Sequence, residues 1–308
     1  MPPHVSIRTR FASALVALGA VLTSGCESAI FRIANHGLEA PEATVRYSED
    51  PDLALDIYQA VGASAAAPTV VFFYGGGWQR GERAQYQFVG RRLARHGVLV
   101  IVADYRTWPA AGFPAFVHDA ARAVQWTQAN VGSHGGDPQQ IFLAGHSAGA
   151  QIAALLAADP RYLRDVGLEP SALAGVVGLS GPYDFVISGR YRPVFGPPSQ
   201  WPQAQAINFV DGNEPPFLLI HGSDDGVVAP RNSEQLARKL RTSGVPARVV
   251  LIEDAGHSAP LMGLYDPDRS PLVVPAILDF VGPAAGNESP AIETDPASSI
   301  SRPSPAPG

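Results

Sequence analysis

The sequence predicts an α/β fold in which a mostly parallel central sheet carries helices on both faces. Short apolar runs rich in β-branched and aromatic residues recur along the chain, as is typical of strands buried on both faces of a parallel sheet. Segments with apolar residues at helical spacing lie between these runs. The 308 residues, of which 46% are hydrophobic and 16% charged, can bury a core large enough for one large domain.

The elements follow one another in the order that such a fold requires. Residues 43–59 alternate apolar and polar side chains around a Pro-Asp pair, which predicts two short antiparallel strands. Further strands are expected at 68–74, 98–103, 141–144, 174–180, 216–221 and 247–252, and helices at 83–96, 115–131, 151–158 and 231–243. Residues 185–214 are rich in proline, aromatic and polar residues without a clear period, which predicts a small lid.

The first 26 residues have the pattern of an export signal. Arg8 and Arg10 precede an apolar run at 11–22, which is too short to span a bilayer comfortably, and small residues lead to Cys26. The segment 22–26 resembles a bacterial lipoprotein processing site, so we expect Cys26 to be lipidated and the protein to be held on a membrane of the cell envelope. The alternatives are a plain signal peptide, which would leave a soluble periplasmic or secreted protein, or an uncleaved anchor.

The two ends flank one expected catalytic domain. Residues 27–42 are interpreted as a linker, 43–283 as the domain, and 284–308, rich in proline, serine and alanine, as a disordered tail. Cys26 is the only cysteine, so the chain forms no intramolecular disulfide.

Several classes of function are disfavoured by composition. A net charge of −6 without a basic cluster argues against nucleic acid as a partner. The sequence has no phosphate-binding loop, no paired cysteine or histidine at metal-ligand spacing and no internal repeat. We therefore expect neither a cofactor nor a metal.

The segment Gly145-His146-Ser147-Ala148-Gly149 is the centre of the predicted site. An apolar run precedes it and an alanine-rich stretch follows, which is the strand, turn and helix context of a nucleophile elbow. The glycines would relieve crowding at such a sharp turn, and the backbone N–H of Ala148 would face a developing oxyanion. An ordinary tight turn is the alternative in a chain with 31 glycines.

Three glycines, Gly75, Gly76 and Gly77, follow the expected strand at 68–74 and precede Trp78. Such a loop can turn its backbone N–H groups toward one point and supply the second donor of an oxyanion hole. Alone, three glycines indicate only a flexible turn, but their place upstream of Gly-x-Ser-x-Gly is more specific.

These motifs resemble the α/β-hydrolase superfamily, and within it the carboxylesterases whose loop reads His-Gly-Gly-Gly-Trp. The resemblance covers residues 43–280 and implies an α/β-hydrolase fold with a small lid. It also implies a catalytic triad of Ser147, Asp225 and His257, with Gly76, Gly77 and Ala148 as the oxyanion hole. This chain has Tyr74 where the family has His, which puts in doubt the hydrogen bonds that brace the loop.

The acid and the base are assigned by chain order and by the family pattern. The order Ser, Asp, His is the one that α/β-hydrolases use. The pattern His-Gly-x-x-Asp-x-x-Val runs from His221 to Val228 and selects Asp225, so Asp224 is expected to face solvent or bind backbone N–H groups. His221 comes too early to be the base, and His146 is expected to point away from the site.

The resemblance implies a serine hydrolase that cleaves small carboxylic esters through an acyl-enzyme. The short segment between residues 181 and 216 favours a shallow pocket and a small acyl group. The alternatives are an arylformamidase-type amide hydrolase acting on a substrate like N-formylkynurenine, and a non-catalytic lipoprotein that keeps the hydrolase scaffold.

Overall fold

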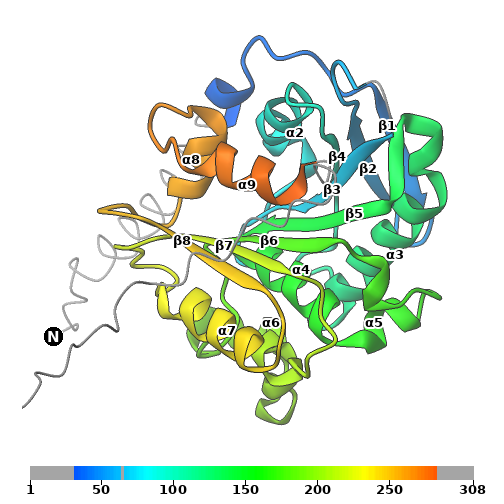
Figure 1. Cartoon of the computed structure of the whole chain (residues 1–308). Coiled ribbons are helices and arrows are strands. Elements are labelled where there is room, and N and C mark those ends of the chain that lie inside the picture. Colours follow the sequence, from blue (N-terminus) through cyan, green and yellow to red (C-terminus); the bar gives the residue numbers. More distant parts are fainter. Residues whose placement is uncertain (1–30, 64–65, 283–308) are drawn as a thin grey trace, which may run out of the picture.

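A single eight-stranded sheet forms the centre of the structure, a computed structural model that describes residues 31–63 and 66–282 (Figure 1). The strand order is β1-β2-β4-β3-β5-β6-β7-β8, and of these strands β2 alone runs against the others. The strands are β1 (Ala43–Ser48), β2 (Leu53–Tyr58), β3 (Ala67–Phe73), β4 (Leu99–Ala103), β5 (Gly136–His146), β6 (Gly175–Leu179), β7 (Phe217–Gly222) and β8 (Ala247–Ile252). The predicted mostly parallel sheet is confirmed.

The middle strands are buried on both faces, as their continuous apolar runs predict. Every residue of β3, β4, β6 and β7 is buried. Strand β5 begins five residues earlier than the sequence pattern predicts. Gly135 turns the chain with a φ of 85°, and Gly136 already pairs with Ala67, so the polar residues that follow belong to the strand rather than to a turn.

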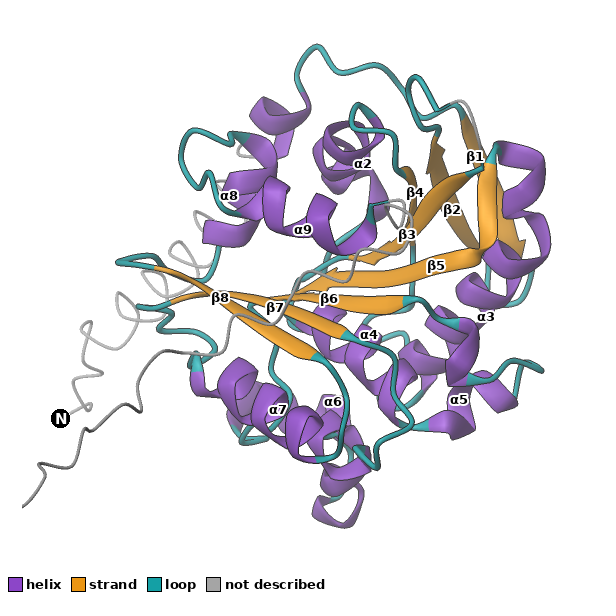
Figure 2. Ribbon diagram, in the orientation of Figure 1, coloured by secondary structure: helices purple, strands orange, loops and turns teal. Residues whose placement is uncertain are grey.

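Helices cover both faces of the sheet (Figure 2). One face carries α2 (Gln87–Ala94), α8 (Ala259–Tyr265) and α9 (Val273–Val281), and the other carries α3 (Ala115–Asn130), α4 (Ala148–Ala158), α5 (Pro160–Arg164) and α7 (Arg231–Thr242). Helices α5, α8 and α9 were not predicted from the sequence. Helix α8 has only seven residues, and the proline- and aspartate-rich stretch after it interrupts any helical period before α9 begins.

The predicted lid folds into short helical turns beside the sheet. These are η4 (Gly189–Tyr191), α6 (Arg192–Phe195), η5 (Pro198–Ala204) and η6 (Ala206–Phe209). Phe195 is fully buried and packs edge-on against Trp78, with ring centroids 4.8 Å apart. The lid therefore packs on the loop that follows β3.

The described part of the expected linker is fixed to the domain. Residues 31–35 form a short helix. Asn35 donates from Nδ2 to the carbonyls of Ala84 and Gln85, and its Oδ1 accepts from the Phe88 amide at 3.0 Å. The side chain of Arg91 binds the Glu39 carbonyl. These bonds hold the N-terminal segment against α2.

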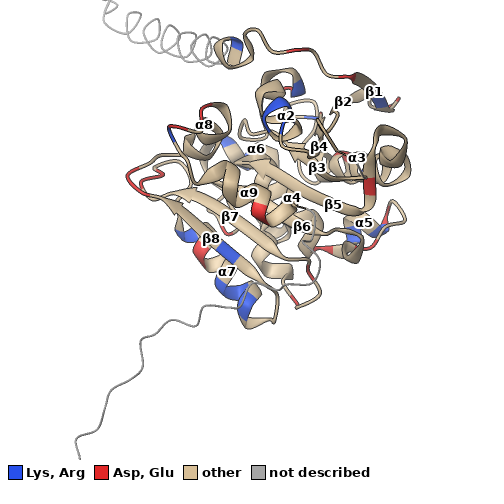
Figure 3. Ribbon diagram, turned by 45° about the horizontal axis from the view of Figure 1, so that its top comes forward, with Lys and Arg blue, Asp and Glu red and all other residues tan. Residues whose placement is uncertain are grey.

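Charged residues occur mainly on the helices and loops, and several of the basic residues belong to α7 (Figure 3). None of the helices described is long and apolar enough to cross a membrane. The expected export segment, Cys26 and the expected tail lie outside the described residues.

Candidate active site

Ser147 occupies the sharp turn between β5 and α4. Its φ of 54° and ψ of −117° are rare for a residue other than glycine. A Cβ on Gly145 would overlap the backbone of Gly149, and a Cβ on Gly149 would overlap the carbonyl of Phe73. The two glycines therefore permit the close strand-to-helix approach that holds Ser147 at the turn.

Backbone groups from two segments lie beside Ser147. Gly76 and Gly77 have φ values of 134° and 63°, and both line the same pocket as Ser147. Any Cβ on Gly76 would overlap the Arg80 carbonyl, so the loop needs glycine there. Ala148 is the first residue of α4, and the amides at a helix N-terminus favour an anion.

Tyr74 braces this loop in place of the family's histidine. Its hydroxyl lies 3.3 Å from Asp104 Oδ1 and 3.3 Å from the Tyr105 carbonyl. Tyr105 in turn donates its hydroxyl to the Tyr74 carbonyl at 2.7 Å, and the two rings stack. Arg83 binds the other carboxylate oxygen of Asp104. Burial and the nearby Asp104 carboxylate raise the pKa of Tyr74, so the hydroxyl stays a donor.

Trp78 ties the same loop to the elbow helix and the lid. Its indole N–H donates to Gln151 Oε1 at 3.1 Å, and Gln151 Nε2 donates to the carbonyl of Ala204 in the lid at 2.8 Å. The Trp78 ring also stacks on Phe185 with centroids 5.3 Å apart. One buried glutamine therefore holds three segments around Ser147 in a fixed relation.

Asp225 and His257 are hydrogen-bonded to each other. The distance from Asp225 Oδ2 to His257 Nδ1 is 2.7 Å, and the Asp225 side chain has no exposed surface. Asp225 Oδ1 accepts from the amides of Val227 and Val228 at 2.8 and 2.9 Å. Burial acts to raise the pKa of Asp225, but the hydrogen bonds from His221, His257 and the Val228 amide outweigh it and hold this pKa well below its usual range.

The neighbouring carboxylate, Asp224, is exposed, and its Oδ1 lies 3.5 Å from the Ser223 hydroxyl. The structure therefore places the residue selected by the sequence spacing, Asp225, against the histidine.

His221 is a second histidine on the same carboxylate, a contact that was not predicted from the sequence. Its Nε2 lies 3.1 Å from Asp225 Oδ2 and 2.8 Å from the Val228 carbonyl, while its Nδ1 lies 2.7 Å from the Ser233 hydroxyl. Because a carbonyl oxygen only accepts, Nε2 carries a proton and donates it. His221 is thus a buried donor that orients the carboxylate.

We expected His146 to point away from the site, but its side chain lines the pocket beside His257. Its ring centroid is 4.9 Å from that of His257, and its Nε2 lies 3.1 Å from the His257 carbonyl. Burial and the neighbouring His257 lower the pKa of His146 to about 3, so the ring is neutral near pH 7. No local pattern signals this position, because the group beside His146 is the loop that carries His257, 111 residues further along the chain.

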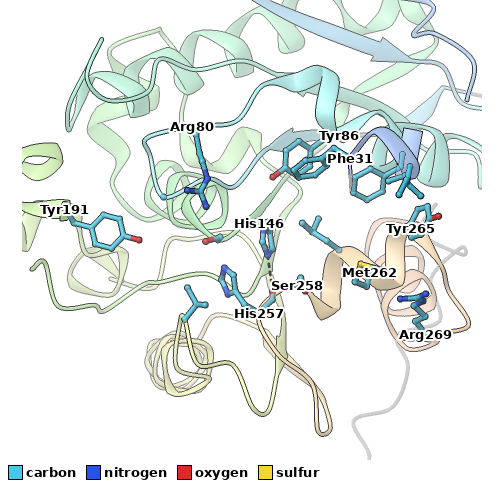
Figure 4. Close-up of a pocket in the computed structure, with 18 of the residues that line it drawn as sticks. Phe31, Arg80, Tyr86, His146, Tyr191, His257, Ser258, Met262, Tyr265 and Arg269 are labelled. Atoms are coloured by element: carbon cyan, nitrogen blue, oxygen red, sulfur yellow. Dashed lines mark hydrogen bonds between the residues drawn. The ribbon is translucent and has the colours of Figure 1, made fainter. Parts of the chain in front are cut away.

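The pocket that contains Ser147 and His257 has a volume of about 810 Å³ (Figure 4). On one side of the two histidines lies Tyr191 of the lid, and on the other lie Phe31, Met262 and Tyr265. The short lid led us to expect a shallow pocket for a small acyl group, but residues of the N-terminal segment and of α8 also line the pocket and enlarge it.

The arrangement has the parts needed for acyl transfer. With Nδ1 of His257 bound to a carboxylate, Nε2 is the ring nitrogen left to exchange a proton with a hydroxyl such as that of Ser147. Among the residues that the structure describes, no three His, Cys, Asp or Glu side chains gather in a way that could hold a metal ion.

The sheet order, the elbow after β5 and the acid and histidine after β7 and β8 define an α/β-hydrolase. Esterase 2 of Thermogutta terrifontis, in its tabun-modified form, has the same fold, with a TM-score of 0.66 and 23% identity over 80% of this chain and 99% of that one. The acetyl ester-xyloside bifunctional hydrolase of Caldicellulosiruptor lactoaceticus has a TM-score of 0.65 and 22% identity over 80% of this chain and 100% of that one.

The family model described as BD-FAE matches residues 55–240, and the chain belongs to this family. A probable isoprenylcysteine alpha-carbonyl methylesterase of rice, Oryza sativa subsp. japonica, is 32% identical over 73% of this chain and 59% of its own length. Esterase LipC of Mycobacterium tuberculosis is 33% identical over 71% of this chain and 60% of its own length. The chain thus spans about six tenths of these curated relatives.

Proposed function

We propose that the protein is a carboxylic ester hydrolase that works through an acyl-enzyme on Ser147. The observation that carries this proposal is the 2.7 Å hydrogen bond from buried Asp225 to His257, which lines the same pocket as the strained Ser147. The relatives and structural neighbours whose names describe esterases support the same chemistry.

In the proposed reaction His257 Nε2 takes the proton from Ser147 Oγ as that oxygen bonds to the ester carbonyl carbon. The carbonyl oxygen becomes an oxyanion, which the backbone N–H groups of Gly76, Gly77 and Ala148 stabilise; one such donor contributes about 3 to 4 kcal/mol. The bond to the alcohol oxygen then breaks, and His257 gives that oxygen its proton. Water then attacks the acyl-enzyme, with His257 taking the water's proton and returning a proton to Ser147 as the acid leaves.

We propose that the acyl group is small. The Tyr191 hydroxyl approaches Gly77 so closely that a Cβ there would lie 3.3 Å from it, which narrows the pocket on the lid side. Structures of Thermogutta terrifontis esterase 2 are described with propionate and with butyrate bound, which supports a short acyl chain.

The proposal is tested with a covalent phosphorylating reagent, diisopropyl fluorophosphate, on the full chain. We expect p-nitrophenyl acetate to be hydrolysed, and the activity to fall in proportion to the reagent bound, reaching zero at one equivalent on the peptide that contains Ser147. Mass spectrometry locates the label. Full activity after complete labelling, or inactivation by labelling of another residue, would contradict the assignment.

We further propose that the chain is exported and anchored by a lipid on Cys26. Phe31 lines one end of the pocket and lies five positions after Cys26, so the anchor would hold this end of the pocket within about 18 Å of the membrane surface. An ester dissolved in the membrane would then be close to Ser147.

The anchor predicts that the protein sediments with membranes and is released only by detergent, because two or more acyl chains bind stably. Cys26→Ala should become soluble or remain unprocessed, whereas the nearby Ser28→Ala should behave like the natural protein. Fractionation and the mass of the N-terminal peptide measure both. A Cys26→Ala protein that is still cleaved at the same site and still membrane-bound would rule out lipidation.

A further inference from the structure

One side of the pocket is an apolar arm built from three segments far apart in sequence. The N-terminal segment supplies Phe31 and Ala34, helix α2 supplies Phe88, and helix α8 supplies Leu261, Met262 and Tyr265. None of these six side chains is charged. Arg269 lies at the Met262 and Tyr265 side of this arm (Figure 4), and its guanidinium is paired with Asp266 at 3.1 Å.

The arm is a fixed wall of the site. Phe31 contacts the ring of Tyr86 with centroids 5.1 Å apart, and Phe88 meets Tyr265 edge-on at 6.2 Å. The side chain of Arg92, also on α2, donates to the Leu264 and Tyr265 carbonyls at the end of α8, at 2.9 and 2.8 Å. Together with the bonds of Asn35 to the start of α2 and to the turn before it, these contacts join the three segments that form the arm.

The position of the arm relative to His257 indicates which half of an ester it holds. Helix α8 begins two residues after His257, and Ser258 and Leu261 line the pocket after this histidine, so the arm adjoins the loop that carries His257. Tyr191 lies on the other side of the two histidines (Figure 4), where its hydroxyl approaches Gly77. When the tetrahedral intermediate collapses, the bond from carbon to the alcohol oxygen breaks and that oxygen takes the proton from His257. The alcohol oxygen must therefore lie next to His257, which favours the arm beyond the His257 loop, rather than the side at Gly77, as the place of the alcohol half.

Resting on the proposed esterase function, we propose that the apolar arm binds the alcohol half of the substrate and that this half is a long hydrocarbon chain. The acyl half remains small, on the side of Tyr191. A pocket of about 810 Å³ lies in the range of sites that bury ligands much larger than a small ester. Each methylene buried in the arm is expected to raise kcat/KM by about fourfold until the arm is filled.

Two series of esters measure the preference: acetates of ethanol, hexanol and decanol, and ethyl esters of acetic, hexanoic and decanoic acids. We expect kcat/KM to rise with the alcohol chain by at least about a hundredfold from ethyl to hexyl acetate, and not to rise with the acyl chain. A rise in the acyl series, alone or together with the alcohol series, or a rise in neither series, would overturn the proposal.

Two variants locate the effect in the arm. Met262→Asp places a charge on α8, and Ala34→Trp fills the arm from the N-terminal segment. In both, the ratio of kcat/KM for hexyl acetate to that for ethyl acetate should fall at least about tenfold. The matched control is Leu272→Asp, an exposed residue that does not line the pocket, in which the ratio should stay unchanged.

An unchanged ratio in both arm variants, with circular dichroism showing that they fold, would refute this inference. A failure of the esterase proposal gives a different result: hydrolysis of ethyl acetate would then continue after Ser147 is labelled.

Discussion

Ser147→Ala is expected to lower kcat for p-nitrophenyl acetate by at least about a thousandfold while leaving the fold intact. Without the hydroxyl no acyl-enzyme forms, and the remaining rate depends on the backbone N–H groups and on substrate binding. The fold should survive because alanine keeps the Cβ that the turn already accommodates at a φ of 54°.

The chain offers a matched control in Ser180→Ala. Ser180 is buried, has a positive φ of 50° as Ser147 does, and does not line the pocket. Its hydroxyl has no hydrogen-bond partner within the described part of the chain, so alanine removes little. This variant should keep kcat within about twofold. Steady-state kinetics with circular dichroism on both variants decides the matter, and a Ser147→Ala protein with near-normal turnover would exclude the acyl-enzyme.

Local sequence patterns predicted the sheet because each buried strand is an apolar run bounded by glycine, proline or polar residues. Helices α8 and α9 were missed for a physical reason. Helix α8 is held by contacts with distant parts of the chain, such as the bonds from Arg92 to its end, and α9 packs against α8, so neither depends on a clear helical period of its own. Such long-range contacts cannot be inferred from the pattern of residues that are neighbours in the sequence.

The candidate site was likewise predicted only in part. Chain order and spacing placed Asp225 and His257 together, because parallel strands bring the loops after β7 and β8 to one edge of the sheet. The side chain of His146 and the packing of Phe31 depend on how the elbow turns and where the N-terminal segment docks. Neither could be inferred from the residue types alone, so the extent of the pocket was underestimated.

The substitution Asp225→Asn is a more specific test of the carboxylate than Asp225→Ala, because the surrounding N–H donors fix the orientation of the new side-chain amide. The Val227 and Val228 amides both donate to Oδ1, so the amide oxygen of the new asparagine would take that place and its NH₂ would face His257. A donor facing Nδ1 forces the His257 proton onto Nε2, where the ring can no longer accept the proton of Ser147. His221, whose Nε2–H also points at this position, would meet a second donor instead of an acceptor.

We therefore expect Asp225→Asn to lower kcat by about ten thousandfold, the size of effect seen when a triad carboxylate is replaced by its amide. Asp224→Asn removes the same charge one position away, from an exposed side chain, and should cost no more than a few fold. Both variants are measured on p-nitrophenyl acetate, with circular dichroism to establish folding. If Asp224→Asn were the inactive protein, or if both kept normal turnover, the hydrogen bond between Asp225 and His257 would have no part in catalysis.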